Sequence, residues 1–216
     1  MTSPLQDVAA AVDLSVAAGQ HPAMQLGDDV ARRLECSVLP RGDVSVSGAR
    51  FDVVDGQQVV TIRPALDDDA DTIARIWHEA WGDGHRGNVP DALVRHRGRE
   101  QFLPRAAERV AHSWIGELDG NAHGFVTVAD DELEQIFVVG AGRGSGLATA
   151  LIERGKAAIR DAGHHTAWLA VVAGNARARA FYEREGWADV GPIDYQAETS
   201  DGLIDVPCRR YTIALG

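Results

Sequence analysis

The sequence predicts a mixed α/β fold in which helices flank a mostly antiparallel sheet. Two observations carry this prediction. Four segments have apolar residues at helical spacing, and three consecutive short strand segments are separated by turns too short to join parallel neighbours. The predicted order is a strand, two helices, three strands, a helix, a strand, a helix and closing strands. Such an order places helices against a single sheet.

Two amphipathic helices are expected before the three central strands. The acidic run from Asp67 to Asp69 can cap the first helix and complement its dipole, and Gly82 is expected to end it. In the second helix, Pro104 lies in the first turn. The connection between them, Gly82 to Gly98, is expected to be a loop. The apolar residues that define the two helices are Ile73, Ile76, Trp77, Ala80 and Trp81 in the first, and Phe102, Ala106, Val110 and Trp114 in the second.

The remaining elements alternate between strands and helices. Short strands are predicted at Trp114 to Leu118, His123 to Val128 and Glu132 to Val138. The helix that follows ends at Gly163, and its apolar face consists of Leu147, Leu151, Ile152, Gly155 and Ile159. Further along, the sequence predicts a buried strand at Ala167 to Ala173, a helix at Ala176 to Glu185, and one or two closing strands at Leu203 to Leu215.

The chain is expected to divide near Asp55 into an N-terminal extension, residues 1–55, and a main domain, residues 56–216. Ser45 to Val54 and Gln57 to Arg63 are predicted strands, because the Asp55-Gly56 pair between them suits a two-residue hairpin turn. The extension is therefore expected to add a strand to the sheet, and the rest of its fold stays open.

Composition limits the classes of function. The chain has 216 residues, a formal charge of −11 and 45% hydrophobic residues, as expected of a soluble globular protein. The negative charge argues against a nucleic-acid partner, and no apolar stretch approaches the roughly 20 residues of a membrane span. Asp7 and Asp13 lie where a secretory leader would be positive, so a cytoplasmic location is expected. Cys36 and Cys208 stand far apart and the histidines lack metal-ligand spacing, so no metal is expected.

A glycine-rich turn joins a predicted strand to a predicted helix at Gly140 to Gly146. Backbone N–H groups and the helix dipole converge at such a turn, which makes it a binding site for anions, typically phosphates. A P-loop would require a lysine after the glycines, and none follows. A dinucleotide fingerprint would require a third glycine where Ser145 or Leu147 stands, and an acidic residue where the next strand ends in Gly174-Asn175. Both nucleotide interpretations therefore fail.

The turn and its surroundings resemble the acetyl-CoA signature of the GNAT superfamily of N-acyltransferases. The resemblance covers about Val59 to Leu215 and rests on the order of three motifs: Ile136-Phe137-Val138, Arg143-x-x-Gly146-x-Ala148, and Asn175 followed by Phe181-Tyr182-x-x-x-Gly186-Trp187. It implies that the coenzyme A pyrophosphate is held by the loop residues Arg143, Gly144, Ser145, Gly146, Leu147, Ala148 and Thr149. Gly140 replaces a proline common in the family, and Ala170 stands where some relatives have a catalytic glutamate.

The resemblance also implies roles at the thioester. Val138 would give its backbone N–H to the thioester oxygen, and Tyr182 would protonate the departing thiolate. Tyr182 could instead be a core aromatic. Asn175 would bind the pantetheine arm, or it simply ends the strand. For the base, strand alternation places Glu132, Glu134, Ile136 and Val138 on one face. Glu134 is the first choice, and Glu132 matches the base position of some relatives.

The function expected from these residues is transfer of an acetyl group from acetyl-CoA to a primary amine of a small molecule or peptide, by direct attack in a ternary complex. The alternative is a non-catalytic protein that binds acetyl-CoA as a sensor or serves as an interaction module. The identity of the amine stays open, as does assembly into a homodimer.

Overall fold

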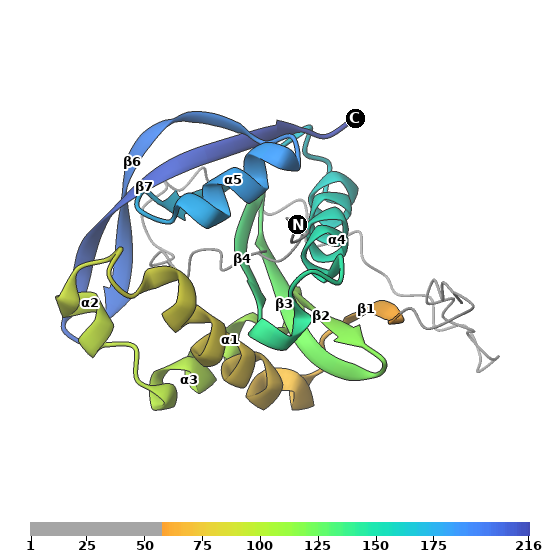
Figure 1. The fold of residues 1–216 in the computed structure, drawn as a ribbon, viewed down its shortest axis with the longest axis horizontal. Coiled ribbons are helices and arrows are strands. Elements are labelled where there is room, and N and C mark those ends of the chain that lie inside the picture. Colours follow the sequence, from red (N-terminus) through yellow and green to blue (C-terminus); the bar gives the residue numbers. More distant parts are fainter. Residues whose placement is uncertain (1–57) are drawn as a thin grey trace, which may run out of the picture.

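A computed structural model describes residues 58–216 (Figure 1). The predicted strand at residues 45–54 lies outside the described residues, as does the predicted boundary near Asp55. The strand predicted to begin at Gln57 is present as β1, Val60–Pro64. None of the helices in residues 58–216 is long and apolar enough to span a bilayer.

The strands form one seven-stranded sheet in the order β1-β2-β3-β4-β5-β7-β6. All neighbouring strands are antiparallel except β4 and β5, which are parallel. The predicted mixed, mostly antiparallel sheet is therefore confirmed. Besides β1, the strands are β2 (Ser113–Leu118), β3 (Asn121–Ala129), β4 (Glu132–Val138), β5 (Thr166–Val172), β6 (Ala188–Thr199) and β7 (Gly202–Ala214).

Five α-helices accompany the sheet in the described residues: α1 (Ala70–His85), α2 (Asp91–Arg95), α3 (Phe102–Arg109), α4 (Leu147–Asp161) and α5 (Ala176–Arg184). The predicted end of the first helix at Gly82 is wrong. The helix continues to His85, whose ring is fully buried, stacks on Trp81 at 4.7 Å between centroids, and lies 2.8 Å from the Trp81 carbonyl oxygen through Nδ1. Burial of that last turn outweighs the low helix propensity of glycine.

One further boundary and two whole elements differ from the prediction. The second helix ends at Arg109, and Trp114 belongs to β2. Helix α2 lies within the segment predicted as a loop. It was not predicted because its five residues are too few to show a helical period. Strand β6 was not predicted, because Gly191 and Pro192 interrupt its sequence and most of its residues are exposed or only partly buried.

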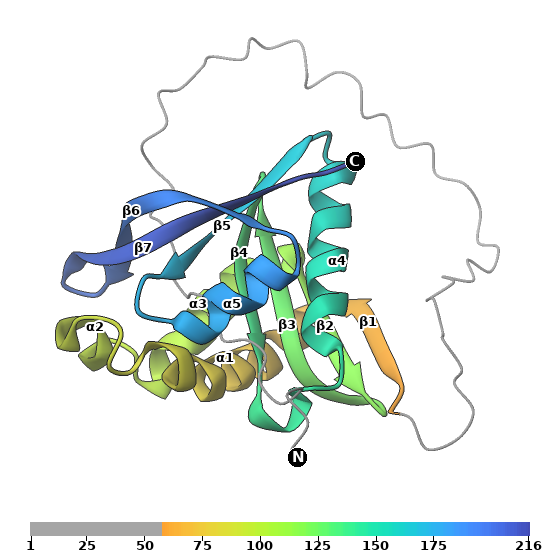
Figure 2. The ribbon, with the colours of Figure 1, turned by 45° about the horizontal axis from the view of Figure 1, so that its top comes forward.

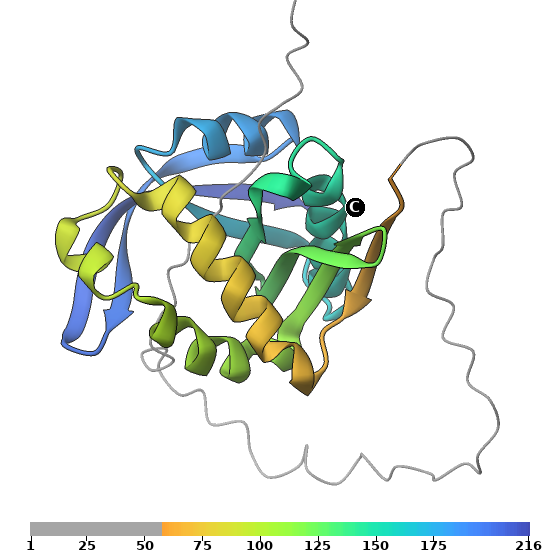
Figure 3. The same cartoon turned by 60° about the horizontal axis from the view of Figure 1, so that its bottom comes forward.

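Helices cover both faces of the central strands (Figures 1 and 3). The ring of Phe125 in β3 packs against Trp77 of α1, with 5.8 Å between centroids, whereas the next residue, Val126, lies against Gly155 of α4. Successive side chains of a strand point to opposite faces, so α1 and α4 lie on opposite sides of β3. A side chain at Gly155 would meet Leu133 and Val126 at 3.3 Å, which explains the glycine in the middle of α4.

Strands β4 and β5 separate along their length (Figure 2). They are paired at one position, Glu132 opposite Trp168, near the start of β4. Strand β5 pairs along its other edge with β7 from Thr166 to Val172. Because β4 and β5 run in the same direction, their carboxyl ends form the open end of a wedge, and the edge of β4 facing the wedge has no strand partner beyond Glu132.

Candidate active site

The glycine-rich turn forms the start of α4 at the open end of this wedge. Gly144 has a φ of +77° and Gly146, the residue before the helix, a φ of +84°, conformations that favour glycine. The hydroxyl of Ser145 donates to the Gly142 carbonyl (2.8 Å) and accepts from the Leu147 N–H (3.3 Å). The tight turn between the strand and α4 is fixed by these contacts.

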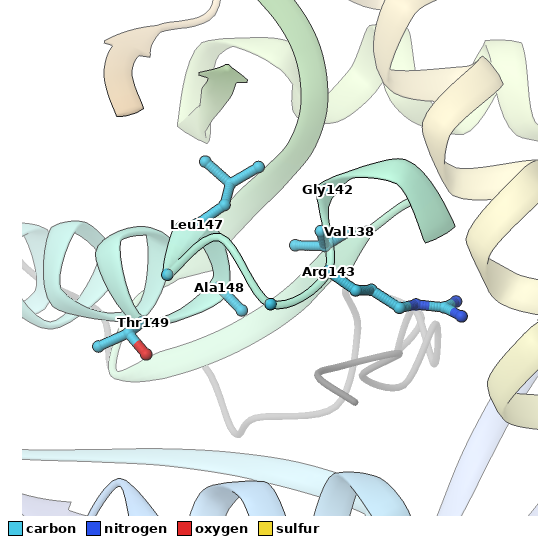
Figure 4. A pocket seen from close by; sticks show the side chains of 8 residues that line it. Val138, Gly142, Arg143, Leu147, Ala148 and Thr149 are labelled. Atoms are coloured by element: carbon cyan, nitrogen blue, oxygen red, sulfur yellow. The ribbon is translucent and has the colours of Figure 1, made fainter. Parts of the chain in front are cut away.

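The turn encloses a small pocket that fits an anion (Figure 4). The hydrogen bonds within α4 begin with the Ala150 N–H, which donates to the Gly146 carbonyl. The N–H groups of Ala148 and Thr149, in the first turn, therefore have no acceptor within the helix. Unpaired N–H groups at a helix N-terminus favour negative charge. The structure brings most of the predicted loop residues to this pocket, which is lined by Val138, Gly142, Arg143, Gly144, Gly146, Leu147, Ala148 and Thr149. The Ser145 side chain instead serves the turn.

The Arg143 side chain leaves the loop and points toward α1 (Figure 4). Its guanidinium pairs with the carboxylate of Asp83, a contact that the sequence did not predict. The hydroxyl of Thr149 also turns away from the pocket and donates to Glu185 at 3.2 Å. With these two side chains turned away, main-chain groups line much of the pocket, and the role of the loop backbone in holding a pyrophosphate stays a prediction.

The edge of β4 offers N–H groups to the wedge. The Val139 N–H donates to His123 of β3 at 2.9 Å, and in an antiparallel ladder the neighbouring residue then directs its own N–H away from that partner. The N–H groups of Val138 and Ile136 therefore face the β5 side, whereas that of Phe137 faces β3. The Phe137 ring is a core residue, 5.7 Å from Phe125 and 6.1 Å from Trp77 between centroids.

Helix α5 supplies Tyr182, whose side chain is fully buried. Its ring packs against Trp187 and Tyr211, at 6.1 and 6.2 Å between centroids. Among the described residues, the Tyr182 hydroxyl has no hydrogen-bond partner. Burial raises the pKa of Tyr182, so the group keeps its proton and stays an O–H donor. At the start of α5, the Asn175 Oδ1 caps the helix by accepting from the Ala178 N–H at 3.1 Å.

A β-bulge in β4 overturns the predicted alternation of its side chains. Thr127 pairs with Gln135 and Val128 with Leu133, which leaves Glu134 as an extra residue. Leu133 consequently lies against Gly155 of α4, on the side opposite to Phe137. The prediction that Glu132, Glu134, Ile136 and Val138 share one face was wrong, because a bulged residue shifts the alternation and leaves no mark in the hydrophobic pattern.

The two glutamates have different environments. Glu132 lies at the closed end of the wedge and accepts a hydrogen bond from Tyr195 of β6 at 3.0 Å. Burial raises the pKa of Glu132 to about 8, against the opposing effect of the Tyr195 hydrogen bond. Glu134 forms an ion pair with Arg109 of α3, with 3.0 Å between Oε1 and Nε, and both side chains are largely buried. Glu132 can therefore exchange a proton near neutral pH, whereas Glu134 is held by a cation.

The comparison with family models decides the family. The model of the acetyltransferase (GNAT) family matches residues 72–187, more than half of the chain. The chain belongs to the GNAT acetyltransferase family. The match runs from α1 to Trp187 and includes the glycine-rich turn, β4, β5 and Tyr182. No match was found among curated proteins.

Solved structures share the GNAT fold at low sequence identity. A GCN5-related N-acetyltransferase from Rhodopseudomonas palustris is 15% identical, with a TM-score of 0.56 over 76% of this chain and 100% of that one. The acetyltransferase yncA from Salmonella typhimurium, solved with its cofactor acetyl-CoA, is 19% identical, with a TM-score of 0.54 over 73% and 94%. An N-acetyltransferase from Staphylococcus aureus Mu50 is 17% identical, with a TM-score of 0.53 over 73% and 99%.

Several residues of this GNAT site escaped the sequence analysis. Tyr195 belongs to an unpredicted strand, and Asp83 and Arg109 gave no periodic or motif signal. Gln135 belongs to no motif. A charge search would have found complementary pairs, but only the fold shows that residues as distant in sequence as Asp83 and Arg143 meet.

Proposed function

We propose that this GNAT protein is an N-acetyltransferase that transfers the acetyl group of acetyl-CoA to a primary amine by direct attack in a ternary complex. The observation that carries the proposal is the wedge between β4 and β5. A main-chain anion site opens beside it, and unpartnered N–H groups line its β4 edge. The buried, unpartnered Tyr182 hydroxyl adds a proton donor. The related yncA structure contains acetyl-CoA.

The residues present fit the cosubstrate. Acetyl-CoA supplies an activated thioester. The backbone of Gly144 to Thr149 would hold its pyrophosphate, and the Val138 N–H would bind the acetyl oxygen as negative charge develops there. Ile136 and Phe137 would flank this position on β4, and Asn175 would steady the start of α5 beside the pantetheine arm.

Glu132 and Tyr182 would move the protons. The amine must be neutral to attack, and Glu132, roughly 20 Å along β4 from Val138, would take its proton through intervening water molecules and not by direct contact. As the C–S bond breaks, Tyr182 would donate its proton to the thiolate, and the proton held by Glu132 restores the balance through solvent. We assign the base to Glu132 in preference to Glu134, because Glu134 is already paired with Arg109.

The proposal is tested by screening amines for release of free coenzyme A thiol. Amino acids, polyamines, aminoglycosides and peptide N-termini cover the main classes of primary amine. The expected result is thiol release that depends on one of these amines and on acetyl-CoA together. Tight binding of acetyl-CoA without release for any amine would favour the sensor function instead.

The pH dependence distinguishes the two glutamates. Below about pH 8 the Glu132 carboxyl is mostly protonated and cannot act as a base, so kcat/KM should rise more steeply with pH below about 8, where Glu132 and the amine both ionise, than above it, where only the amine does. Glu132→Gln should remove this limb, leave only the ionisation of the amine, and lower kcat/KM about 10²-fold at pH 8, the low end for a lost general base because water can accept the proton. Initial rates between pH 6 and 10, roughly the range in which the two groups ionise, provide the measurement.

Glu134→Gln is the matched control. It should keep the steeper limb, because the carboxyl that titrates is still present, and should move that limb to lower pH, because the Glu134 charge is one of the causes that raise the pKa of Glu132. Glu132→Gln should fold normally, since glutamine mimics the protonated form that burial favours. A limb that survives in Glu132→Gln and disappears in Glu134→Gln would return the role of base to Glu134.

A further inference from the structure

Gln135 carries a buried amide with nothing to bind. Its side chain is fully buried in β4, and within residues 58–216 neither Oε1 nor Nε2 has a hydrogen-bond partner. Leaving a buried amide unpaired is unfavourable, and native structures rarely retain such a group without a reason. The Thr127 hydroxyl, opposite Gln135 on the neighbouring strand, bonds to Ser113 at 2.8 Å and not to the Gln135 amide.

Strand alternation determines where Gln135 lies. Gln135 and Phe137 are two residues apart in regular register with β3, so they share the face covered by α1, as the contact between Phe137 and Trp77 shows. The bulge at Glu134 turns Leu133 to the opposite face, against α4. Gln135 stands three residues from both Glu132 and Val138, roughly 10 Å along the strand from each. It thus lies midway between the proposed base and the proposed thioester contact.

Two more unpaired donors belong to this layer. The Nε1–H groups of Trp77 and Trp81, one helical turn apart on α1, are buried and have no acceptor among the described residues. Trp77 packs on the ring of Phe137, and Trp81 lies one turn closer to the end of α1. Among the described residues, the layer between α1 and β4 therefore contains two indole N–H donors without an acceptor and the unpaired side-chain amide of Gln135.

We propose that Gln135 is a specificity-determining residue and that the acceptor is an amine bearing an amide, such as an aminoacyl amide or a peptide N-terminus. This inference rests on the proposed N-acetyltransferase function. An amide offers a C=O to the Gln135 Nε2–H and an N–H to Oε1, so it satisfies both idle atoms at once. A carboxylate could pair only with Nε2, and a polyamine only with Oε1. Because Gln135 has no exposed surface, binding requires neighbouring side chains to move aside.

Two acceptors with the same methyl-substituted carbon beside the amine, and one substitution, test the proposal. Alaninamide carries the amide, and isopropylamine lacks it. Gln135→Met keeps the length of the side chain and removes both polar atoms. We expect kcat/KM for alaninamide to fall about 10- to 100-fold in the variant, as for a lost hydrogen bond at a buried site, while kcat/KM for isopropylamine changes less than about threefold. Ratios of variant to wild type cancel the different pKa values of the two amines.

Two further readouts exclude a merely structural role. The KM for acetyl-CoA should stay unchanged, and the Tm of the ligand-free variant should equal or exceed that of the wild type, because two unsatisfied polar atoms are removed. Gln135→Leu serves as a second variant if methionine prevents folding. Equal losses for both amines, a lower Tm, or an unchanged rate with alaninamide would each overturn the inference.

Failure of the proposed function gives a different pattern. If the wild type releases no thiol with any amine, binding of alaninamide to the complex with coenzyme A is measured by calorimetry for the wild type and Gln135→Met. Weaker binding by the variant supports the amide site without catalysis. Equal binding, or none to either protein, rejects it.

Discussion

Tyr182→Phe should lower kcat by about 10²- to 10⁴-fold while the Kd for acetyl-CoA changes less than about threefold. The hydroxyl is the only part of the side chain removed, and within the described residues it has no hydrogen-bond partner to lose. The loss expected is that of a general acid. Calorimetry gives the Kd, and thiol release with the best amine of the screen gives kcat.

Tyr211→Phe is the matched control for this substitution. The two rings lie 6.2 Å apart, but the Tyr211 hydroxyl is engaged, because it accepts from Arg179 at 3.2 Å and donates to Glu183 at 2.9 Å. Removing it should cost some stability and leave kcat within about threefold of the wild type. Turnover at the wild-type level in Tyr182→Phe would make Tyr182 a core aromatic.

Gly146→Glu should abolish binding of acetyl-CoA. Gly146 has a φ of +84° directly before α4, where the free N–H groups of the helix start. A glutamate there would strain the turn and put a negative charge in front of the same N–H groups, in place of the phosphate. Titration of the purified variant with acetyl-CoA, at concentrations up to 100 times the wild-type Kd, should give no heat of binding.

Gly163→Glu separates strain from function. Gly163 follows the other end of α4, has a φ of +98°, and like Gly146 has open space around the position of a side chain. The same substitution should therefore cost similar stability and leave the affinity for acetyl-CoA intact. Undiminished binding in Gly146→Glu, or equal loss in both variants, would contradict the assignment of the loop.

Elements with a strong period or a short turn could be predicted from the sequence. The apolar face predicted for α4 is fully buried, and β2 to β4 begin and end within a few residues of their predicted limits. Features that depend on contacts between distant residues could not be predicted in this way. The end of α1 depends on the His85 ring finding a place against Trp81, and β6 gains its order from pairing with β7 along its length.

The residues of the candidate site also fall into a predictable group and an unpredictable one. The glycine-rich turn and Tyr182 carry local motifs, so the sequence alone could single them out. The roles of Glu132 and Glu134 depend on one extra residue in β4, which reverses the alternation of the side chains before it. Their charges depend on partners from distant elements, Tyr195 for Glu132 and Arg109 for Glu134.

The most direct test of acetyl transfer in a ternary complex is the stoichiometry of the products. Protein saturated with acetyl-CoA is mixed with the best amine of the screen, and free thiol, N-acetyl product and the intact mass of the protein are followed together. The account predicts one thiol for each N-acetyl product, no thiol release without amine, and no increase in protein mass. Thiol release without amine accompanied by an acetylated protein, or bound acetyl-CoA that yields no product with any amine, would contradict it.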